Sequence, residues 1–202
     1  MPRQPDPDLE ERILKSAQVL WKKGGEEALT MRAVARAAKT NTPAVYRRFK
    51  DREDLIRGLL RRIGQQIGKY FEACDSIEDL AEAYIDQALE LPHEYELFYT
   101  HASALSPARG TGRPRPIRES RGNFALVEKL LAKKLGGSPQ DHTQLALAIW
   151  SELHGTTMLL LSKAIPEGHE EELRCSCRSA VKVLLERTPV PRNGHSRTSA
   201  EN

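Results

Sequence analysis

The sequence predicts an all-α protein with an N-terminal three-helix domain, which contains a helix-turn-helix, and a C-terminal helical bundle. Apolar residues recur at every third or fourth position through most of the chain, which is typical of amphipathic helices. Runs of β-branched residues that alternate with period two are absent from the sequence. Breaks rich in Gly and Pro divide the periodic segments into about nine predicted helices.

The first helices are predicted from their caps and breaks. The first begins near Pro7-Asp8 and ends at Gly24-Gly25, because paired glycines stop helices. Thr30 is a suitable N-cap for a short second helix, and Asn41 for a short third helix. Pro43 is tolerated in the first turn of that third helix. Helix two and helix three therefore form a helix-turn-helix at about residues 30–49.

The remaining helices are longer and form the predicted bundle. Asp51 caps the fourth helix, the fifth follows Asp75-Ser76, and the sixth opens at Pro92. We expect the last three at about residues 117–135, 139–164 and 167–187. Residues 106–116 are predicted to be a loop and 188–202 a disordered tail. The predicted domains are residues 7–52 for the three-helix domain and 53–187 for the bundle.

The distribution of charge points to a polyanion-binding N-terminal region. The 202 residues carry a net charge of +3, but residues 1–65 hold 15 Lys and Arg against 9 Asp and Glu. Residues 66–202 hold 16 against 19, so the excess of positive charge lies in the first third. A basic region on a mildly acidic body is typical of proteins that bind nucleic acid, although a solvated basic surface would look the same.

Composition argues against several other classes. No apolar run approaches the length of a membrane-spanning helix, and the N-terminus lacks the apolar region of a secretory signal. An odd number of cysteines fits a reducing compartment, so a cytoplasmic protein without membrane attachment is expected. Cys175 and Cys177 lie two apart and do not share a helix face, so no metal or cofactor is expected. Because no catalytic motif is present, an enzyme on a helical bundle is a remote alternative.

The third helix carries side chains suited to a DNA major groove. If Val45 and Phe49 point inward, Thr42, Ala44, Arg47 and Arg48 point outward. Arginine can bond guanine bidentately, and Thr and Ala can contact a thymine methyl group. Phosphate contacts are expected at the flanks. The full set of expected DNA contacts is Thr30, Arg32, Asn41, Thr42, Pro43, Ala44, Tyr46, Arg47, Arg48, Lys50 and Arg52. A helical subdomain with a basic face is the alternative interpretation.

Residues 11–63 resemble the DNA-binding domain of the tetracycline-repressor (TetR) family of bacterial transcription regulators. The resemblance lies in three segments: Ile13-Leu14 with Ala17, Leu20-Trp21 and Gly24; Leu29–Ala38; and Pro43–Phe49 followed by Arg52–Leu55. It implies that Tyr46 and Arg52 bond phosphates, and that Thr42, Pro43, Ala44 and Arg47 contact bases or the groove. It also implies a homodimer on a pseudo-palindromic operator in double-stranded DNA, with repression as the default.

Two residues of the turn depart from the family pattern. Lys39 stands where the family usually has Gly, and Thr40 stands where a small aliphatic residue is common. Gly is favoured because a helix C-cap often needs positive φ. A lysine in that conformation would cost roughly 1 kcal/mol.

The C-terminal half resembles one TetR C-terminal type at Trp150–Gly155, which looks like that type's Trp–His–Gly motif. Residues 83–98 are similar to the same type's fifth and sixth helices. The helix at 139–164 has two apolar stripes: Leu145, Ile149, Leu153 and Leu160; and Leu147, Trp150, His154, Met158 and Leu161. A helix apolar on two sides needs two partners, here its own bundle and a second subunit. A buried helix in a larger monomeric core is the alternative.

The residues of the expected dimer interface and effector pocket are less well defined by the pattern. The interface is expected to include Leu153, Gly155, Leu160, Val181 and Leu184. The pocket candidates are Tyr84, His93, Tyr99, Trp150 and His154, although Trp150 and His154 could instead serve helix packing. The sequence indicates neither the effector nor the operator, and a DNA-binding or interaction protein without an effector is the alternative.

Gly58, Gly64 and Gly68 weaken the fourth helix, and we hypothesise that the last two let it shift.

Overall fold

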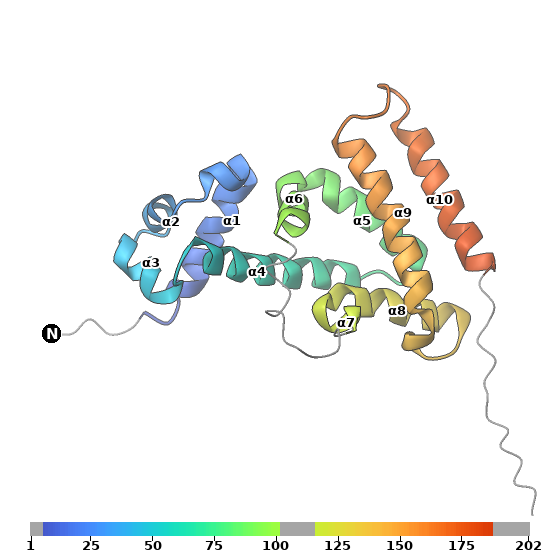
Figure 1. Cartoon of the computed structure of the whole chain (residues 1–202), viewed down its shortest axis with the longest axis horizontal. Helices are drawn as coiled ribbons and strands as arrows, with labels where there is room; N and C mark the ends of the chain where they lie inside the picture. The colour runs from blue at the N-terminus through green and yellow to red at the C-terminus, as the bar shows by residue number, and fades with distance from the viewer. Residues whose placement is uncertain (1–5, 102–115, 188–202) are drawn as a thin grey trace, which may run out of the picture. The chain divides into compact units, whose positions relative to one another are not determined.

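The regular elements of the structure are all helical in the residues that it describes. A computed structural model describes residues 6–101 and 116–187 (Figure 1). The elements in these ranges are α1 (Leu9–Ala28), α2 (Met31–Ala37), α3 (Thr42–Arg48), α4 (Arg52–Glu72), α5 (Ile77–Glu90), α6 (Pro92–Thr100), α7 (Ile117–Ser120), α8 (Gly122–Leu135), the 3-10 helix η2 (Pro139–His142), α9 (Thr143–Leu161) and α10 (Glu170–Arg187). The predicted all-α class is confirmed. Most of the predicted 106–116 loop and the predicted 188–202 tail lie outside the described residues.

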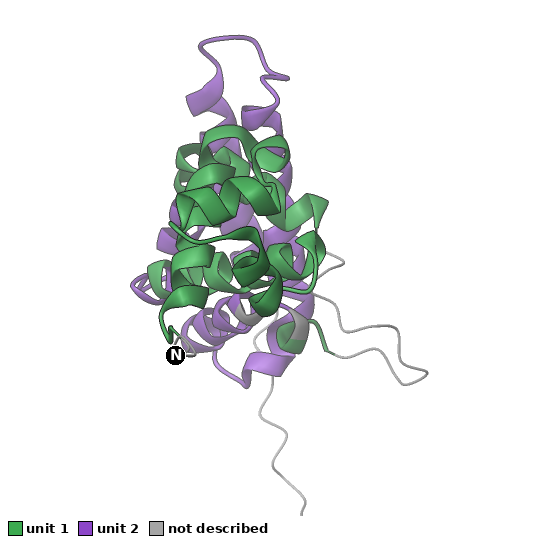
Figure 2. Cartoon of the chain, turned by 90° about the vertical axis from the view of Figure 1, so that its left-hand side faces the viewer, with its two compact units in different colours: residues 1–70, 86–120 green, residues 71–85, 121–202 purple. Residues whose placement is uncertain are grey.

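The chain divides into two compact units that differ from the predicted domains (Figure 2). Unit 1 comprises residues 1–70 and 86–120, and unit 2 comprises residues 71–85 and 121–202. Unit 1 thus takes in most of α4 and the whole of α6 together with the three N-terminal helices. The predicted domain boundary after residue 52 marks the end of the helix-turn-helix segment and not the edge of a compact unit.

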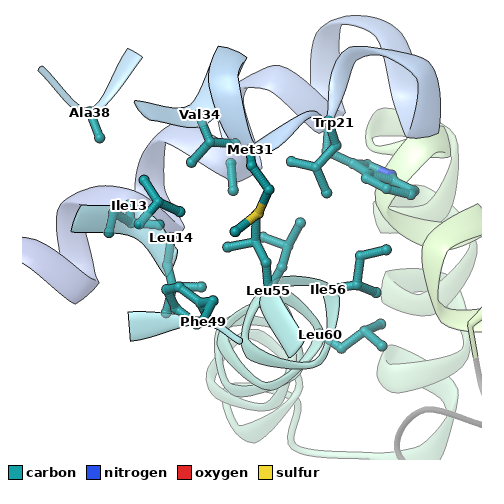
Figure 3. Close-up of a cluster of buried hydrophobic side chains, with 14 of the residues drawn as sticks. Ile13, Leu14, Trp21, Met31, Val34, Ala38, Phe49, Leu55, Ile56 and Leu60 are labelled. Carbon is teal, nitrogen blue, oxygen red and sulfur yellow. The ribbon is translucent and has the colours of Figure 1, made fainter. Parts of the chain in front are cut away.

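Unit 1 has one apolar core, in which α4 supplies the longest continuous stripe. Figure 3 shows side chains from α1, α2 and α4 meeting there, with Phe49 from the end of α3. The fully buried members include Ile13, Ala17, Leu29, Val34, Val45, Leu55, Leu59, Leu60, Ile63 and Leu97. Each buried aliphatic side chain of this size stabilises the fold by about 1.5–3 kcal/mol. This core fixes α3 against α1 and α4, because Val45 and Phe49 belong to it.

Gly58 permits the closest helix approach in this core. A Cβ atom at Gly58 would lie 2.9 Å from Cε1 of Phe49 and 3.1 Å from Cδ2 of Leu14. A methyl group does not fit at these distances unless both neighbours move. The glycine is therefore explained by packing of α4 against the end of α3 and against α1. A Cβ atom at Gly64 would lie 3.5 Å from Cζ of Phe98, which is an ordinary contact distance.

Several helix ends differ from the prediction. Gly24 and Gly25 have non-helical backbone angles, but the chain resumes helical turns for one further turn, so α1 is kinked there and ends at Ala28. The predicted helix at 117–135 is divided into α7 and α8, and the predicted helix at 139–164 begins as η2. The last helix begins at Glu170, three residues later than predicted. Caps and breaks thus located the helices better than they located their ends.

Unit 2 packs α9 against α8, η2 and α10. One predicted stripe of α9 forms part of its interior, because Leu145, Ile149 and Leu153 are buried. The helices α9 and α10 run side by side (Figure 1). Among the described residues, no helix combines the length and apolarity that crossing a membrane requires.

Candidate nucleic-acid interface

Side-chain caps and a left-handed turn residue define the helix-turn-helix. The hydroxyl oxygen of Thr30 accepts from the Ala33 amide at 3.1 Å, and the side-chain oxygen of Asn41 accepts from the Ala44 amide at 2.9 Å. Lys39 has φ of 52°, so it adopts the conformation for which the family uses glycine. The Thr40 amide donates to the Ala35 carbonyl at 2.9 Å, which closes α2 as a glycine C-cap would. The turn therefore has the geometry that is usual in the family, and the strained backbone conformation lies at Lys39.

The outer face of α3 presents polar and basic side chains. Val45 and Phe49 are buried as predicted, while Tyr46 is 52% exposed and Arg47 is also exposed. The expectation that Ala44 points outward is wrong, because it is 4% exposed. A side chain with so little accessible surface offers almost nothing for a base to contact in the free protein.

Most other candidate contacts lie at the surface of the same unit. Arg32, Asn41, Pro43, Arg48 and Lys50 are exposed, and Thr42 is half-buried. The Arg48 guanidinium donates from Nη2 to the Asp6 carbonyl at 3.1 Å, which joins the segment before α1 to the end of α3. The caps use the side-chain oxygens of Thr30 and Asn41 as acceptors, so the donor hydrogens of those side chains can still serve a phosphate.

Arg52 is engaged within the protein, which the family resemblance did not imply. Its guanidinium donates from Nε to the Leu29 carbonyl at 2.9 Å, from Nη1 to the Glu26 carboxylate at 2.9 Å and from Nη2 to the Glu26 carbonyl at 2.8 Å. The hydrogen bond from Arg52 lowers the pKa of the Glu26 carboxyl group, so the pair is ionic at neutral pH. Sequence reasoning missed Glu26, because nothing in its local pattern marks it.

The structure brings together two of the five predicted pocket residues. The Trp150 indole donates to the Tyr84 hydroxyl at 3.3 Å. Tyr84 stacks on Phe71 with ring centroids 6.3 Å apart, and Trp150 meets Phe124 edge-on at 6.3 Å. An aromatic cluster of Phe71, Tyr84, Phe124 and Trp150 thus joins α4, α5, α8 and α9 in unit 2. The sequence showed no such cluster because its members come from four separated segments.

The other three pocket candidates have different surroundings. His154 is half-buried one helical turn after Trp150, and burial lowers the pKa of its imidazole, which favours the neutral form. His93 and Tyr99 belong to unit 1. The His93 carbonyl accepts from the Trp21 indole at 2.6 Å, and Tyr99 packs on Tyr95 with ring centroids 4.6 Å apart. The Trp21 bond to the His93 carbonyl joins α1 to α6, whereas the Tyr95–Tyr99 contact lies within α6.

The predicted interface residues fall into buried and accessible groups. Leu153 and Val181 are each 2% exposed within the single chain, so they have almost no surface left for a partner. Gly155 is exposed, and Leu160 and Leu184 are half-buried. Other apolar side chains on the same two helices are exposed: Leu147, Met158, Leu159 and Val183. The second predicted stripe of α9 thus reaches the surface through Leu147 and Met158. Among the described residues, no group of three or more His, Cys, Asp or Glu side chains could hold a metal ion.

The capped helix pair and the exposed basic face of its second helix define a helix-turn-helix DNA-binding protein. A family model described as bacterial regulatory proteins, tetR family, matches residues 13–59, and one described as tetracyclin repressor-like, C-terminal domain, matches residues 77–184. The chain belongs to the TetR family of transcription regulators, and such regulators are not enzymes. The second match includes the Trp150–Gly155 segment.

Solved structures share the fold at low sequence identity. A TetR-family transcriptional regulator from Streptomyces coelicolor is 20% identical, with a TM-score of 0.62, and the match covers 90% of this chain and 99% of that one. The multidrug binding protein EbrR complexed with imidazole is 22% identical, with a TM-score of 0.64 and coverage of 95% and 96%. EbrR complexed with ethidium is 21% identical, with a TM-score of 0.63 and coverage of 89% and 99%. No curated protein matches the chain.

Proposed function

We propose that this regulator is a repressor that binds a pseudo-palindromic operator as a homodimer and releases it when a small molecule binds unit 2. The observation that carries the proposal is the outer face of α3, where Tyr46 and Arg47 are exposed beside a rigidly capped turn. A helix of this kind fits the major groove, and arginine there can distinguish guanine. Such a regulator acts on the DNA of a bacterial cytoplasm.

Exposed apolar side chains on α9 and α10 support the homodimer. Leu147, Met158 and Leu159 on α9 and Val183 on α10 are each more than a third exposed in the single chain. Large exposed apolar side chains on two adjacent helices are typical of an interaction site. Two copies related by two-fold symmetry would place their recognition helices in successive major grooves, about 34–36 Å apart.

The aromatic cluster supports an effector site in unit 2. Tyr84 and Trp150 are half-buried and carry polar atoms beside the rings of Phe71 and Phe124, and small-molecule sites commonly combine aromatic side chains with a few polar groups. EbrR, a protein of the same fold, has been solved with ethidium. A screen should therefore start with flat aromatic compounds, both cationic and neutral. A regulator without an effector is the second candidate, and it would show no ligand-dependent loss of operator binding.

Selection of bound fragments from random duplex DNA tests the DNA-binding proposal. We expect a pseudo-palindrome whose binding weakens steeply with salt. Arg47→Ala should cost about 1–3 kcal/mol and relax specificity at one position of each half-site. Tyr46→Phe should weaken binding to all sequences and leave the salt slope unchanged, because the tyrosine hydroxyl carries no charge.

The matched control is Arg61→Ala, an exposed arginine on α4 outside the helix-turn-helix. It removes the same charge from the same unit. If Arg61→Ala and Arg47→Ala weaken binding equally and neither alters the selected sequence, α3 is not the recognition helix. Operator complexes are then mixed with candidate compounds, and loss of the complex identifies an effector.

A further inference from the structure

We infer that Arg52 is a positioning residue, which sets the orientation of α3 by clamping the start of α4 to the junction between α1 and α2. This inference rests on the proposed binding of DNA through α3. It differs from the role that the family resemblance implies for the residue, which is a phosphate contact. The three hydrogen bonds use three of the five guanidinium N–H groups, so the clamp is a role of its own that needs no phosphate contact.

The clamp satisfies the end of α1. The last carbonyls of a helix lack partners within the helix, and α1 has no basic residue in its own last turn. Arg52 supplies donors there, because it bonds the Leu29 carbonyl at 2.9 Å and adds a bond of 2.8 Å to the Glu26 carbonyl, which also accepts from the Leu29 amide. Its positive charge also complements the negative end of the α1 dipole. The third guanidinium nitrogen, Nη1, donates to the Glu26 carboxylate at 2.9 Å.

The start of α4 transmits this constraint to α3. Only Phe49, Lys50 and Asp51 separate α3 from Arg52. Phe49 is buried, the Asp54 amide donates to the Asp51 carboxylate at 2.8 Å, and the Lys50 amide donates to Asp54 at 3.1 Å. The connection is therefore rigid. A movement of Arg52 away from Leu29 would turn α3 relative to α2.

The clamp has a further neighbour on the segment that follows α6. The imidazole Nε2 of His101 lies 3.6 Å from the second carboxylate oxygen of Glu26, and its ring meets Trp21 edge-on with centroids 5.9 Å apart. Glu26 thus lies between Arg52 and His101. Lysine cannot replace Arg52 here, because a single ammonium group lacks the planar fork that reaches two carbonyls and a carboxylate together.

Arg52→Lys and Glu26→Gln distinguish the two roles in the full-length protein bound to its selected operator. The clamp predicts that Arg52→Lys loses about tenfold in specific affinity, since charge-assisted hydrogen bonds are removed. It predicts an unchanged salt slope and nearly unchanged nonspecific binding. It also predicts that Glu26→Gln weakens specific binding, although that variant removes a negative charge. Glu27→Gln is the matched control, an exposed neighbour with the same change of charge.

A phosphate contact predicts the opposite pattern. Arg52→Lys would then bind like the natural protein, and Arg52→Ala would lower the salt slope by about 0.9 for each phosphate that it no longer binds. Glu26→Gln would release the guanidinium and tighten binding at least as much as Glu27→Gln. Natural affinity in Arg52→Lys, or binding by Glu26→Gln that is at least as tight as that of Glu27→Gln, overturns the clamp.

Hydrogen exchange tests the clamp without DNA, so its failure can be told from failure of the DNA-binding proposal. The Leu29 amide donates to the Glu26 carbonyl, which Arg52 also bonds. We expect faster exchange in a peptide covering residues 26–33 in Arg52→Lys and in Glu26→Gln, but not in Glu27→Gln. Unchanged exchange in both variants overturns the clamp. Accelerated exchange in a protein that selects no DNA sequence would support the clamp and contradict the recognition role of α3.

Discussion

Lys39 shows how a single residue can preserve a turn at a cost in stability. Its φ of 52° lies in the left-handed region, which costs an ordinary side chain about 1 kcal/mol. Lys163 has φ of 53° after α9, and the Ala164 amide donates to the Leu159 carbonyl in the same hydrogen-bond pattern. The chain therefore ends two helices with lysine where glycine or asparagine would be less strained.

Lys39→Asn should stabilise unit 1 by up to about 1 kcal/mol, because asparagine tolerates the left-handed region better than lysine. The measurement is equilibrium urea unfolding followed through Trp21 fluorescence, in a Trp150→Phe background. Lys50→Asn is the control, since Lys50 lies in the same unit without a positive φ. A Lys39→Asn variant no more stable than Lys50→Asn would contradict the strain argument.

Local signals predicted the residues whose partners are near in sequence. Thr30, Asn41 and Asp51 each bond an amide three residues later, so their caps could be read from spacing alone. The partners of Arg52 lie 23 and 26 residues away, and only the packing of α1 against α4 brings them together. Ala44 was wrongly expected to face outward, because a small side chain is compatible with either face of α3.

Helix α9 carries two apolar stripes, and the structure separates their surroundings. Leu145, Ile149 and Leu153 are buried in unit 2, whereas Leu147 and Met158 are 37% and 44% exposed. Periodicity predicted both stripes, but it could not show that Leu153 and Val181, both expected at the dimer interface, would be buried within the single chain. Burial within the chain depends on which helices pack together, and the sequence alone does not fix that.

Leu159→Glu should separate the proposed dimer without unfolding the chain. Leu159 is 41% exposed in the single chain, so a glutamate can remain solvated there. In a two-fold interface each substitution acts twice, and an unpaired buried charge is strongly destabilising. We expect the dissociation constant of the dimer to rise at least about hundredfold, as measured by sedimentation equilibrium, with unchanged circular dichroism.

Val19→Glu is the control for this experiment. Val19 is 51% exposed on α1, so the substitution introduces the same charge on a different helix. A Leu159→Glu protein that remains dimeric, or a natural protein that sediments as a monomer, would contradict the proposed interface.

At the scale of the whole molecule, α4 belongs to unit 1 up to Tyr70 and ends with Phe71 and Glu72 in unit 2. It supplies the largest part of the core of unit 1, and its residue Phe71 belongs to the aromatic cluster of unit 2. An effector can shift the DNA-binding equilibrium only through different affinities for the two states. A helix that is part of both units is a direct physical route for that coupling.

Replacement of Gly64 and Gly68 with Ala should weaken release of DNA by the effector and leave DNA binding largely intact. A methyl group at Gly64 would lie at an ordinary contact distance from Phe98, so the helix should still fold. Alanine stiffens a helix relative to glycine by about 1 kcal/mol per site. The measurement is the effector concentration that releases half of the operator, and an unchanged value would contradict the hypothesis. Gly58→Ala is unsuitable as a control, because its methyl group would clash with Phe49.

The buried apolar side chains of unit 2 and the exposed apolar side chains of α9 and α10 can change independently of one another. A substitution at Leu147, Met158, Leu159 or Val183 would leave the interior of unit 2 intact. Such a substitution would nevertheless change which surface of a second subunit is complementary to α9 and α10. In a cell that holds several regulators of this family, a dimer of two different subunits would bind an operator that combines one half-site of each. Under the proposed dimer, these four side chains would determine whether a subunit pairs with its own copy or with a related regulator. Changes at these positions soon after a gene duplication would prevent mixed dimers.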